Sequence, residues 1–159
     1  MQFPEPQDEH KWLQRLVGNW TFENECSMGP DQPPMKSTGK DNVRSLGGMW
    51  MLCESEGETP GGGVGRMIMT LGYDPAKRKY VGTFIGSMMN NLWVYEGTRE
   101  GDVLTLDTIG PSFSGDGSLI PYQDIIEIKS DDHRTLSSRC KGPDGNWVKF
   151  MTGNYHRVK

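Results

Sequence analysis

A helical spacing of apolar residues occurs once, close to the start of the chain. Trp12, Leu13 and Leu16 fall on one face of a helix. Asp8 stands before them as a candidate N-cap, and Gly18 follows as a candidate terminator. We therefore predict one short helix of roughly two to three turns.

From Trp20 onward the period changes to two, which is the spacing of a strand with one buried face. Runs rich in Gly, Pro, Asp and Ser separate the alternating segments and are typical of turns. Segment 36–46 is polar and only weakly strand-like, and we place a strand there because the architecture needs one. The first segment carries on its apolar face Trp20, Phe22, Cys26 and Met28. The expected strands are 20–28, 36–46, 48–57, 66–73, 79–87, 92–98, 103–109, 122–129, 134–141 and 147–158.

This succession of about ten short strands contains no second helix long enough for a parallel crossover. A meander leaves two exposed edges, and closing it into a barrel removes them. We therefore predict an all-β fold, an antiparallel up-and-down β-barrel of about ten strands with one short N-terminal helix. A two-sheet sandwich is the alternative, whereas the lack of an internal repeat disfavours a propeller. We predict that residues 1–8 form a polar N-terminal arm and that residues 9–159 form a single domain.

Composition narrows the class of protein. The 159 residues include 17 basic and 21 acidic side chains, giving a formal charge of −4 without any block of like charge. A nucleic-acid binder normally shows a basic stripe, so we expect no nucleic-acid partner. Hydrophobic residues make up 34% of the chain, but 15 aromatic side chains and 10 Met supply bulky apolar surface. This balance fits short strands around a one-sided core.

The lack of a signal-peptide pattern and the spacing of the cysteines predict a cytoplasmic protein. The first eight residues lack the basic and apolar regions of a signal peptide. No apolar run approaches the ~20 residues of a membrane span. Cys26, Cys53 and Cys140 are odd in number and widely spaced, so we expect free thiols rather than a disulfide framework.

Metal and catalytic motifs are missing from the sequence. His10, His133 and His156 lie far apart, and a regular strand would put His133 and Cys140 on opposite faces. There is no Cys-x-x-Cys or His-x-x-x-His pair and no Gly-x-Ser-x-Gly elbow. The glycine run 61–65 lacks the Lys and Ser/Thr of a phosphate-binding loop. We expect neither a metal site nor a cofactor.

Three glutamates, Glu54, Glu56 and Glu58, share one strand face. Such carboxylates could be paired for acid–base chemistry. We favour a charged, solvent-facing row instead.

Gly18-x-Trp20 after a short helix resembles the segment that opens the barrel of lipocalins and their relatives, the calycins. In those proteins the Trp packs across the closed end and an Arg from the last strand lies over it. The resemblance implies structural roles for Gly18 and Trp20, with Arg157 in the place of that Arg.

A longer resemblance covers nearly the whole chain and connects it with a bacterial family known only as a domain of unknown function. The family is expected to form a calycin-like barrel, and it implies no activity. The resemblance rests on Leu16-Val17-Gly18-Asn19-Trp20, Gly47-Gly48-Met49-Trp50-Met51-Leu52, Thr70-Leu71-Gly72-Tyr73-Asp74-Pro75, Leu92-Trp93-Val94-Tyr95-Glu96-Gly97, Asp131-Asp132 and Tyr155-His156-Arg157.

Two further likenesses concern the last strand. Fatty-acid-binding relatives hold a carboxylate with an Arg and a Tyr two positions apart, and Tyr155-x-Arg157 is similar in the opposite order. The planar guanidinium of Arg157 and the phenol hydroxyl of Tyr155 could both donate hydrogen bonds to an oxyanion in a pocket that excludes water. Alternatively, Arg157 could cap Trp20 by a cation–π contact. Some calycin relatives bind haem through a His near the chain's end. His156 would face away from Tyr155 and Arg157 on a regular strand, so we expect no haem.

We predict that the protein binds a small apolar or amphipathic molecule inside the barrel. Flexible Met side chains adapt to varied ligands, and a barrel of this size can hold one. The candidate ligand-binding residues are Tyr155, Arg157, Met51, Met69, Phe84 and Trp93. One alternative is an enzyme that uses Tyr155, Arg157 or a buried Asp124. Another is an interaction module that forms a homodimer through its outer wall.

Overall fold

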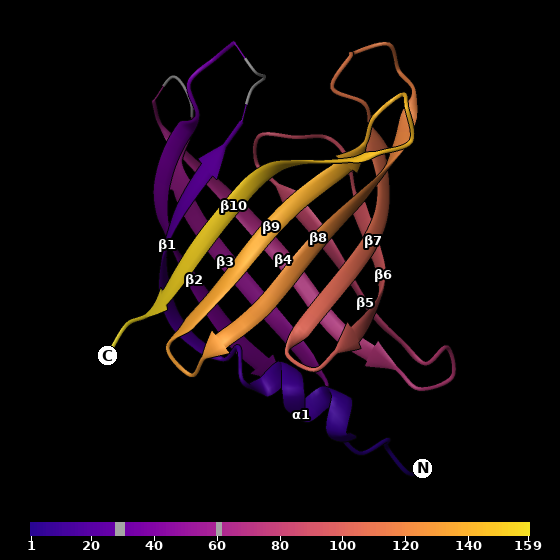
Figure 1. Ribbon diagram of the computed structural model, residues 1–159. Coiled ribbons are helices and arrows are strands. Elements are labelled where there is room, and N and C mark those ends of the chain that lie inside the picture. The colour runs from indigo at the N-terminus through magenta and orange to yellow at the C-terminus, as the bar shows by residue number, and fades with distance from the viewer. Residues whose placement is uncertain (28–30, 60–61) are drawn as a thin grey trace.

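A computed structural model describes residues 1–27, 31–59 and 62–159, and in these ranges it contains one helix and ten strands. The strands form a closed antiparallel barrel in the order β1-β10-β9-β8-β7-β6-β5-β4-β3-β2 (Figure 1). The predicted all-β barrel with one short N-terminal helix is confirmed, and the two-sheet alternative is wrong. The elements are α1 (Asp8–Gln14), β1 (Gly18–Cys26), β2 (Met35–Leu46), β3 (Trp50–Glu58), β4 (Val64–Asp74), β5 (Lys79–Gly86), β6 (Trp93–Glu100), β7 (Val103–Pro111), β8 (Leu119–Ser130), β9 (His133–Lys141) and β10 (Trp147–Arg157).

Closure depends on β1, which pairs with β2 on one side and with β10 on the other. Trp20 lies opposite Asp41 of β2 and opposite Arg157 of β10. The weakly patterned segment 36–46 therefore is a strand, because both of its neighbours supply backbone partners. Its polar appearance has a simple cause, since two of its more enclosed positions are Gly39 and Asp41.

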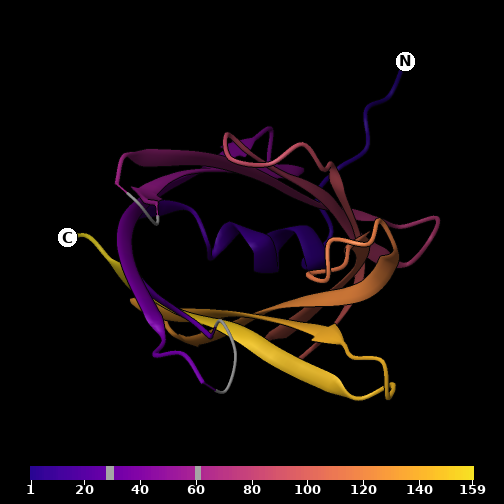
Figure 2. The ribbon, with the colours of Figure 1, turned by 90° about the horizontal axis from the view of Figure 1, so that it is seen from above.

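Helix α1 covers one end of the barrel and crosses that opening in the view from above (Figures 1 and 2). Its N-cap is Gln7 rather than the predicted Asp8, because Gln7 forms a capping box with His10. His10 also lies 3.2 Å from the Tyr73 carbonyl oxygen, which fixes the helix against β4. The buried face of the helix carries Trp12 and Leu13.

Trp20 is the floor of the barrel, with 2% of its surface exposed. Its indole Nε1 donates a hydrogen bond of 2.9 Å to the carbonyl oxygen of Leu16, just after α1. Phe22 follows on the same inward face and packs over the glycine pair Gly39 and Gly57. Cys26 is half-buried, and Met28 lies outside the described residues.

The outward faces carry charge as expected. Glu54 pairs with Arg44, and the Glu56 carboxylate lies 3.9 Å from the Arg66 guanidinium. Glu54, Glu56 and Glu58 are all exposed, which confirms the prediction of a solvent-facing row. Within the described chain, all three cysteines, Cys26, Cys53 and Cys140, are free thiols, and no helix there is long and apolar enough to cross a membrane.

Two inward glycines allow neighbouring strands to approach each other closely. A Cβ atom at Gly82 would overlap the carbonyl oxygen of Thr70, and one at Gly97 would overlap that of Thr105. Both obstacles are backbone atoms of the adjacent strand, so they cannot move aside without breaking the ladder.

We expect Gly97→Ala to lower the free energy of unfolding by about 1–3 kcal/mol, because the added methyl group overpacks against the Thr105 backbone. Gly86→Ala is the matched control on another inward strand position. The three atoms nearest to its Cβ would belong to the flexible side chains of Met88, Met89 and Met67, so a change of no more than about 1 kcal/mol is expected. Urea unfolding followed by circular dichroism measures both. Equal costs would contradict this account of Gly97.

Candidate functional site

A cavity of about 100 Å³ lies inside the barrel. Most of its wall is apolar, and three of the lining residues are methionines, Met67, Met69 and Met151. The other lining residues are Leu16, Phe22, Asn24, Asp41, Cys53, Ser55, Leu71, Phe84, Ile126, Arg134, Leu136 and Tyr155. The wall thus combines adaptable apolar side chains with a small polar part.

The polar part is organised by an ion pair between Arg134 of β9 and Asp41 of β2. Arg134 Nη2 lies 2.6 Å from Asp41 Oδ2, and the two side chains are only 5% and 6% exposed. The guanidinium carbon lies 4.1 Å from the ring centre of Tyr155 and 4.7 Å from that of Trp20. Cation–π contacts with both rings therefore hold the guanidinium in place.

Burial changes the ionisation of these groups. Loss of water raises the pKa of Asp41, and the adjacent Arg134 opposes that rise without cancelling it. Burial also raises the pKa of the Cys53 thiol to about 12. Cys53 is therefore a neutral thiol at physiological pH.

Three buried polar atoms in the cavity wall have no hydrogen-bond partner among the described residues. They are Arg134 Nε, Asp41 Oδ1 and Asn24 Oδ1. Arg134 Nε is a donor, whereas the two oxygens are acceptors. Buried polar atoms are normally satisfied, so three unpartnered atoms on residues that line one cavity mark it as the candidate site.

Asp124 of β8 forms a separate polar cluster. Its carboxylate accepts hydrogen bonds from the Tyr95 hydroxyl and, at 2.5 Å, from Ser138 Oγ. Burial raises the pKa of Asp124, and burial together with the neighbouring carboxylate raises the pKa of Tyr95 well above its usual value. The described wall of the cavity does not include Asp124.

Arg157 lies at the closed end of the barrel. Its guanidinium carbon is 4.3 Å from the Trp20 ring centre. It donates hydrogen bonds to the carbonyl oxygens of Val17 (2.6 Å), Arg15 (3.0 Å) and Asp131 (2.8 Å). The described residues that line the cavity do not include Arg157. Its position is the one expected of an Arg that caps the floor.

The other predicted ligand-binding residues lie in different parts of the barrel. Tyr155, Met69 and Phe84 line the cavity. Met51 is fully buried in the core, but the described lining does not include it. Trp93 packs against Tyr122 with ring centres 4.9 Å apart and donates to Met89 Sδ.

Sequence reasoning missed Arg134 and Asp41, the two charged residues of the site. A signal for both was present, because each lies two positions from an apolar residue on its strand and therefore faces the same, inward side. Arg134 is two positions from Leu136, and Asp41 is two positions from Val43. A charge at an inward position is costly unless it is paired, so it marks either a partner or a function.

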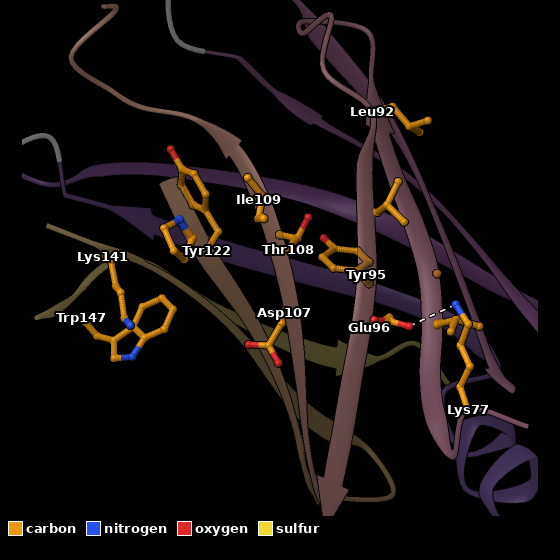
Figure 3. A pocket seen from close by; sticks show the side chains of 14 residues that line it. Lys77, Leu92, Tyr95, Glu96, Asp107, Thr108, Ile109, Tyr122, Lys141 and Trp147 are labelled. Carbon is orange, nitrogen blue, oxygen red and sulfur yellow. Dashed lines mark hydrogen bonds and ion pairs between the residues drawn. The ribbon is translucent and has the colours of Figure 1, made fainter. Parts of the chain in front are cut away.

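Larger hollows lie on the outer wall. One of about 820 Å³ runs over β5 to β8 and reaches Trp147 and Lys141 (Figure 3). Lys77 and Glu96 form an ion pair of 3.1 Å at its edge. Part of its apolar lining is exposed, with Ile109 63% accessible, whereas Tyr95 and Tyr122 in the same lining are buried. This groove holds one buried polar atom without a partner among the described residues, Thr108 Oγ1, whereas three such atoms belong to residues that line the interior cavity.

The remaining histidines lie on the outside. His133 and His156 stack with ring centres 4.8 Å apart, and His133 Nε2 is 3.0 Å from Asn154 Oδ1. Across the described ranges, no group of three or more His, Cys, Asp or Glu side chains is placed to hold a metal ion.

Fold and cavity together define a closed ten-stranded antiparallel barrel with a small interior site. Residues 5–157 match the family described as "Protein of unknown function (DUF1579)", and the chain belongs to this family. No curated protein matches the chain.

Several solved structures share the fold. Rv2717c from M. tuberculosis is similar with a TM-score of 0.65 and 14% identity, covering 98% of this chain and 100% of that chain. EF1p2_mFAP2b bound to DFHBI has a TM-score of 0.52 and 16% identity, with coverage of 94% and 98%. A de novo designed fluorescence-activating β-barrel has a TM-score of 0.50 and 15% identity, with coverage of 91% and 95%. At these identities the likeness shows the fold alone.

We expect Arg134→Met to lower the free energy of unfolding by about 3–5 kcal/mol, because it leaves the Asp41 carboxylate buried without its cation. The double variant Asp41→Leu/Arg134→Met removes both charges and should regain most of that loss. Urea unfolding measures both variants. A double variant that is less stable than Arg134→Met alone would contradict the pairing.

The raised pKa of Asp124 predicts a pH dependence of stability. A carboxyl with a raised folded-state pKa stabilises the fold below its unfolded pKa of about 3.9. That contribution is lost as the pH rises through the raised value. The free energy of unfolding of the wild type should therefore fall relative to that of Asp124→Asn as the pH increases from about 4. Urea unfolding at fixed ionic strength and varied pH tests this, and parallel profiles would count against it.

Proposed function

We propose that this protein binds a small apolar or amphipathic molecule inside the barrel. The observation that carries the proposal is the interior cavity, where apolar walls meet buried polar atoms without partners among the described residues. Ligand sites in proteins have this composition, a mainly apolar lining with a few convergent polar groups.

The size of the cavity limits the ligand. An apolar cavity of about 150 Å³ in another protein holds benzene, so about 100 Å³ suits a slightly smaller molecule. Met67, Met69 and Met151 could enlarge the space, because unbranched thioether side chains change rotamer readily. A compact ligand of about five non-hydrogen atoms fits without such rearrangement.

Similar barrels support the proposal. EF1p2_mFAP2b, which shares the fold at a TM-score of 0.52, is bound to DFHBI. A barrel of this architecture can therefore accommodate a small molecule.

The arrangement of Asp124 favours binding over catalysis. The raised pKa of this carboxyl is the feature that an acid–base enzyme would need. However, the carboxylate already accepts hydrogen bonds from Tyr95 and Ser138. Because both carboxylate oxygens are engaged by protein donors, we assign Asp124 a structural role that links β8 to β6 and β9.

The direct test is a titration with 2-butanone, followed by NMR of ¹³C-labelled methionine methyl groups. We expect saturable shifts of Met67, Met69 and Met151. At a ceiling of about −1.5 kcal/mol per non-hydrogen atom, about five atoms give a dissociation constant no tighter than low micromolar.

Two variants that each add an aromatic ring locate the binding. Leu136→Phe places it in the cavity wall and should weaken binding at least tenfold, because it fills the space. Val94→Phe places it on the outer wall, where Val94 is 57% exposed, and should leave the affinity unchanged. The absence of saturable shifts at the three methyl groups would refute interior binding.

A further inference from the structure

The polar part of the interior cavity has a defined hydrogen-bonding pattern. Arg134 Nε can donate one hydrogen bond, and the Oδ1 atoms of Asp41 and Asn24 can each accept one. All three atoms are buried without partners in the described part of the chain, and all three residues line the cavity. A ligand that satisfies Arg134 Nε and one of the two oxygens must therefore both accept and donate.

The site carries no net charge when its ion pair is formed. Among the described lining residues, Arg134 is the one cation and Asp41 the one anion, and they lie 2.6 Å apart. Cys53 stays a neutral thiol there, since burial raises its pKa to about 12. The positive charge of Arg134 is therefore already matched by a protein carboxylate.

A charged ligand would disturb this balance. A carboxylate would compete with Asp41 for Arg134 and would leave a net negative charge inside the barrel. An ammonium ion would compete with Arg134 for Asp41 and leave a net positive one. An unmatched charge in a buried site is strongly unfavourable. An uncharged head avoids both costs.

The ion pair is also fixed in place. Arg134 lies against the rings of Tyr155 and Trp20, at 4.1 and 4.7 Å. Its side chain is 5% exposed, so it cannot turn to solvent to make room for a second anion without opening the core. The donor at Nε is thus presented in a preorganised position.

We infer that the cavity selects an uncharged molecule whose polar head holds a hydrogen-bond donor next to an acceptor, as in a short primary amide, and rejects carboxylates. This inference rests on the proposed interior binding and names its ligand class. It differs from the carboxylate grip implied by the likeness to fatty-acid-binding proteins. Arg157, the residue that such a grip would use, is engaged by three backbone carbonyl oxygens instead.

Water is the competing occupant, because it too donates and accepts. A ligand with the same head gains in addition from the apolar wall around Met69, Phe84 and Leu136. Propionamide carries such a head on an ethyl group and has nearly the shape of 2-butanone, which only accepts.

The experiment compares propionamide, sodium propionate, n-propylammonium chloride and 2-butanone by the same methionine-methyl titration. We expect propionamide to bind at least tenfold more tightly than propionate and propylammonium, and severalfold more tightly than 2-butanone. Binding of propionate as tight as that of propionamide would overturn the inference while leaving interior binding intact. If none of the four binds, the proposed function fails together with the inference.

A variant separates the head site from the apolar wall. Asp41→Leu/Arg134→Met removes the ion pair and keeps apolar volume, a replacement that buried pairs often tolerate. In this variant the preference for propionamide over 2-butanone should disappear, while 2-butanone still binds. Asn24→Leu, a milder change, should reduce the preference by severalfold. A preference for propionamide that is unchanged in both variants would overturn the inference.

Discussion

The ion pair between Arg134 and Asp41 is the constraint on which the interior depends. It joins β9 to β2, which are separated in the ring by β10 and β1 and whose two residues lie 93 positions apart in sequence. Two buried charges are tolerated only when they are paired and well enclosed, and Trp20 and Tyr155 provide that enclosure. Trp20 is in turn held by Leu16, just after α1, and by Arg157 from β10. The closed floor and the polar end of the cavity are therefore one connected assembly.

Much of the fold could be predicted from local pattern. The change of period at Trp20 and the turn signals between later segments define the ten strands, and the cost of free edges favours closure. β2 was the weak point, because Gly39 and Asp41 occupy positions where an apolar residue would mark a buried face. Only pairing with β1 and β3 makes that segment a strand. The helix cap was also missed. Gln7 and His10 form a capping box, in which the side chain of each bonds to the backbone of the other, whereas the sequence suggested Asp8 as the cap.

The site was less predictable than the fold. Tyr155, Met69 and Phe84 meet at the cavity because inward parity places them on its wall. Tyr155 and Arg157 share that parity, but two positions along a strand span about 6.6 Å. Tyr155 therefore lines the cavity, whereas Arg157 lies over Trp20 at the floor of the barrel. The pairing of Arg134 with Asp41 depends on the registers of β9 with β10, β10 with β1, and β1 with β2, which no local motif encodes.

A crystal structure of the protein soaked in propionamide would test the central claim most directly. The account predicts density for one molecule in the interior cavity, with its carbonyl oxygen within about 2.7–3.2 Å of Arg134 Nε. Its amide nitrogen should lie at a similar distance from Asp41 Oδ1 or Asn24 Oδ1, and its ethyl group should point toward the methionines. A cavity filled by rearranged methionine side chains, with propionamide absent from the interior, would contradict the account.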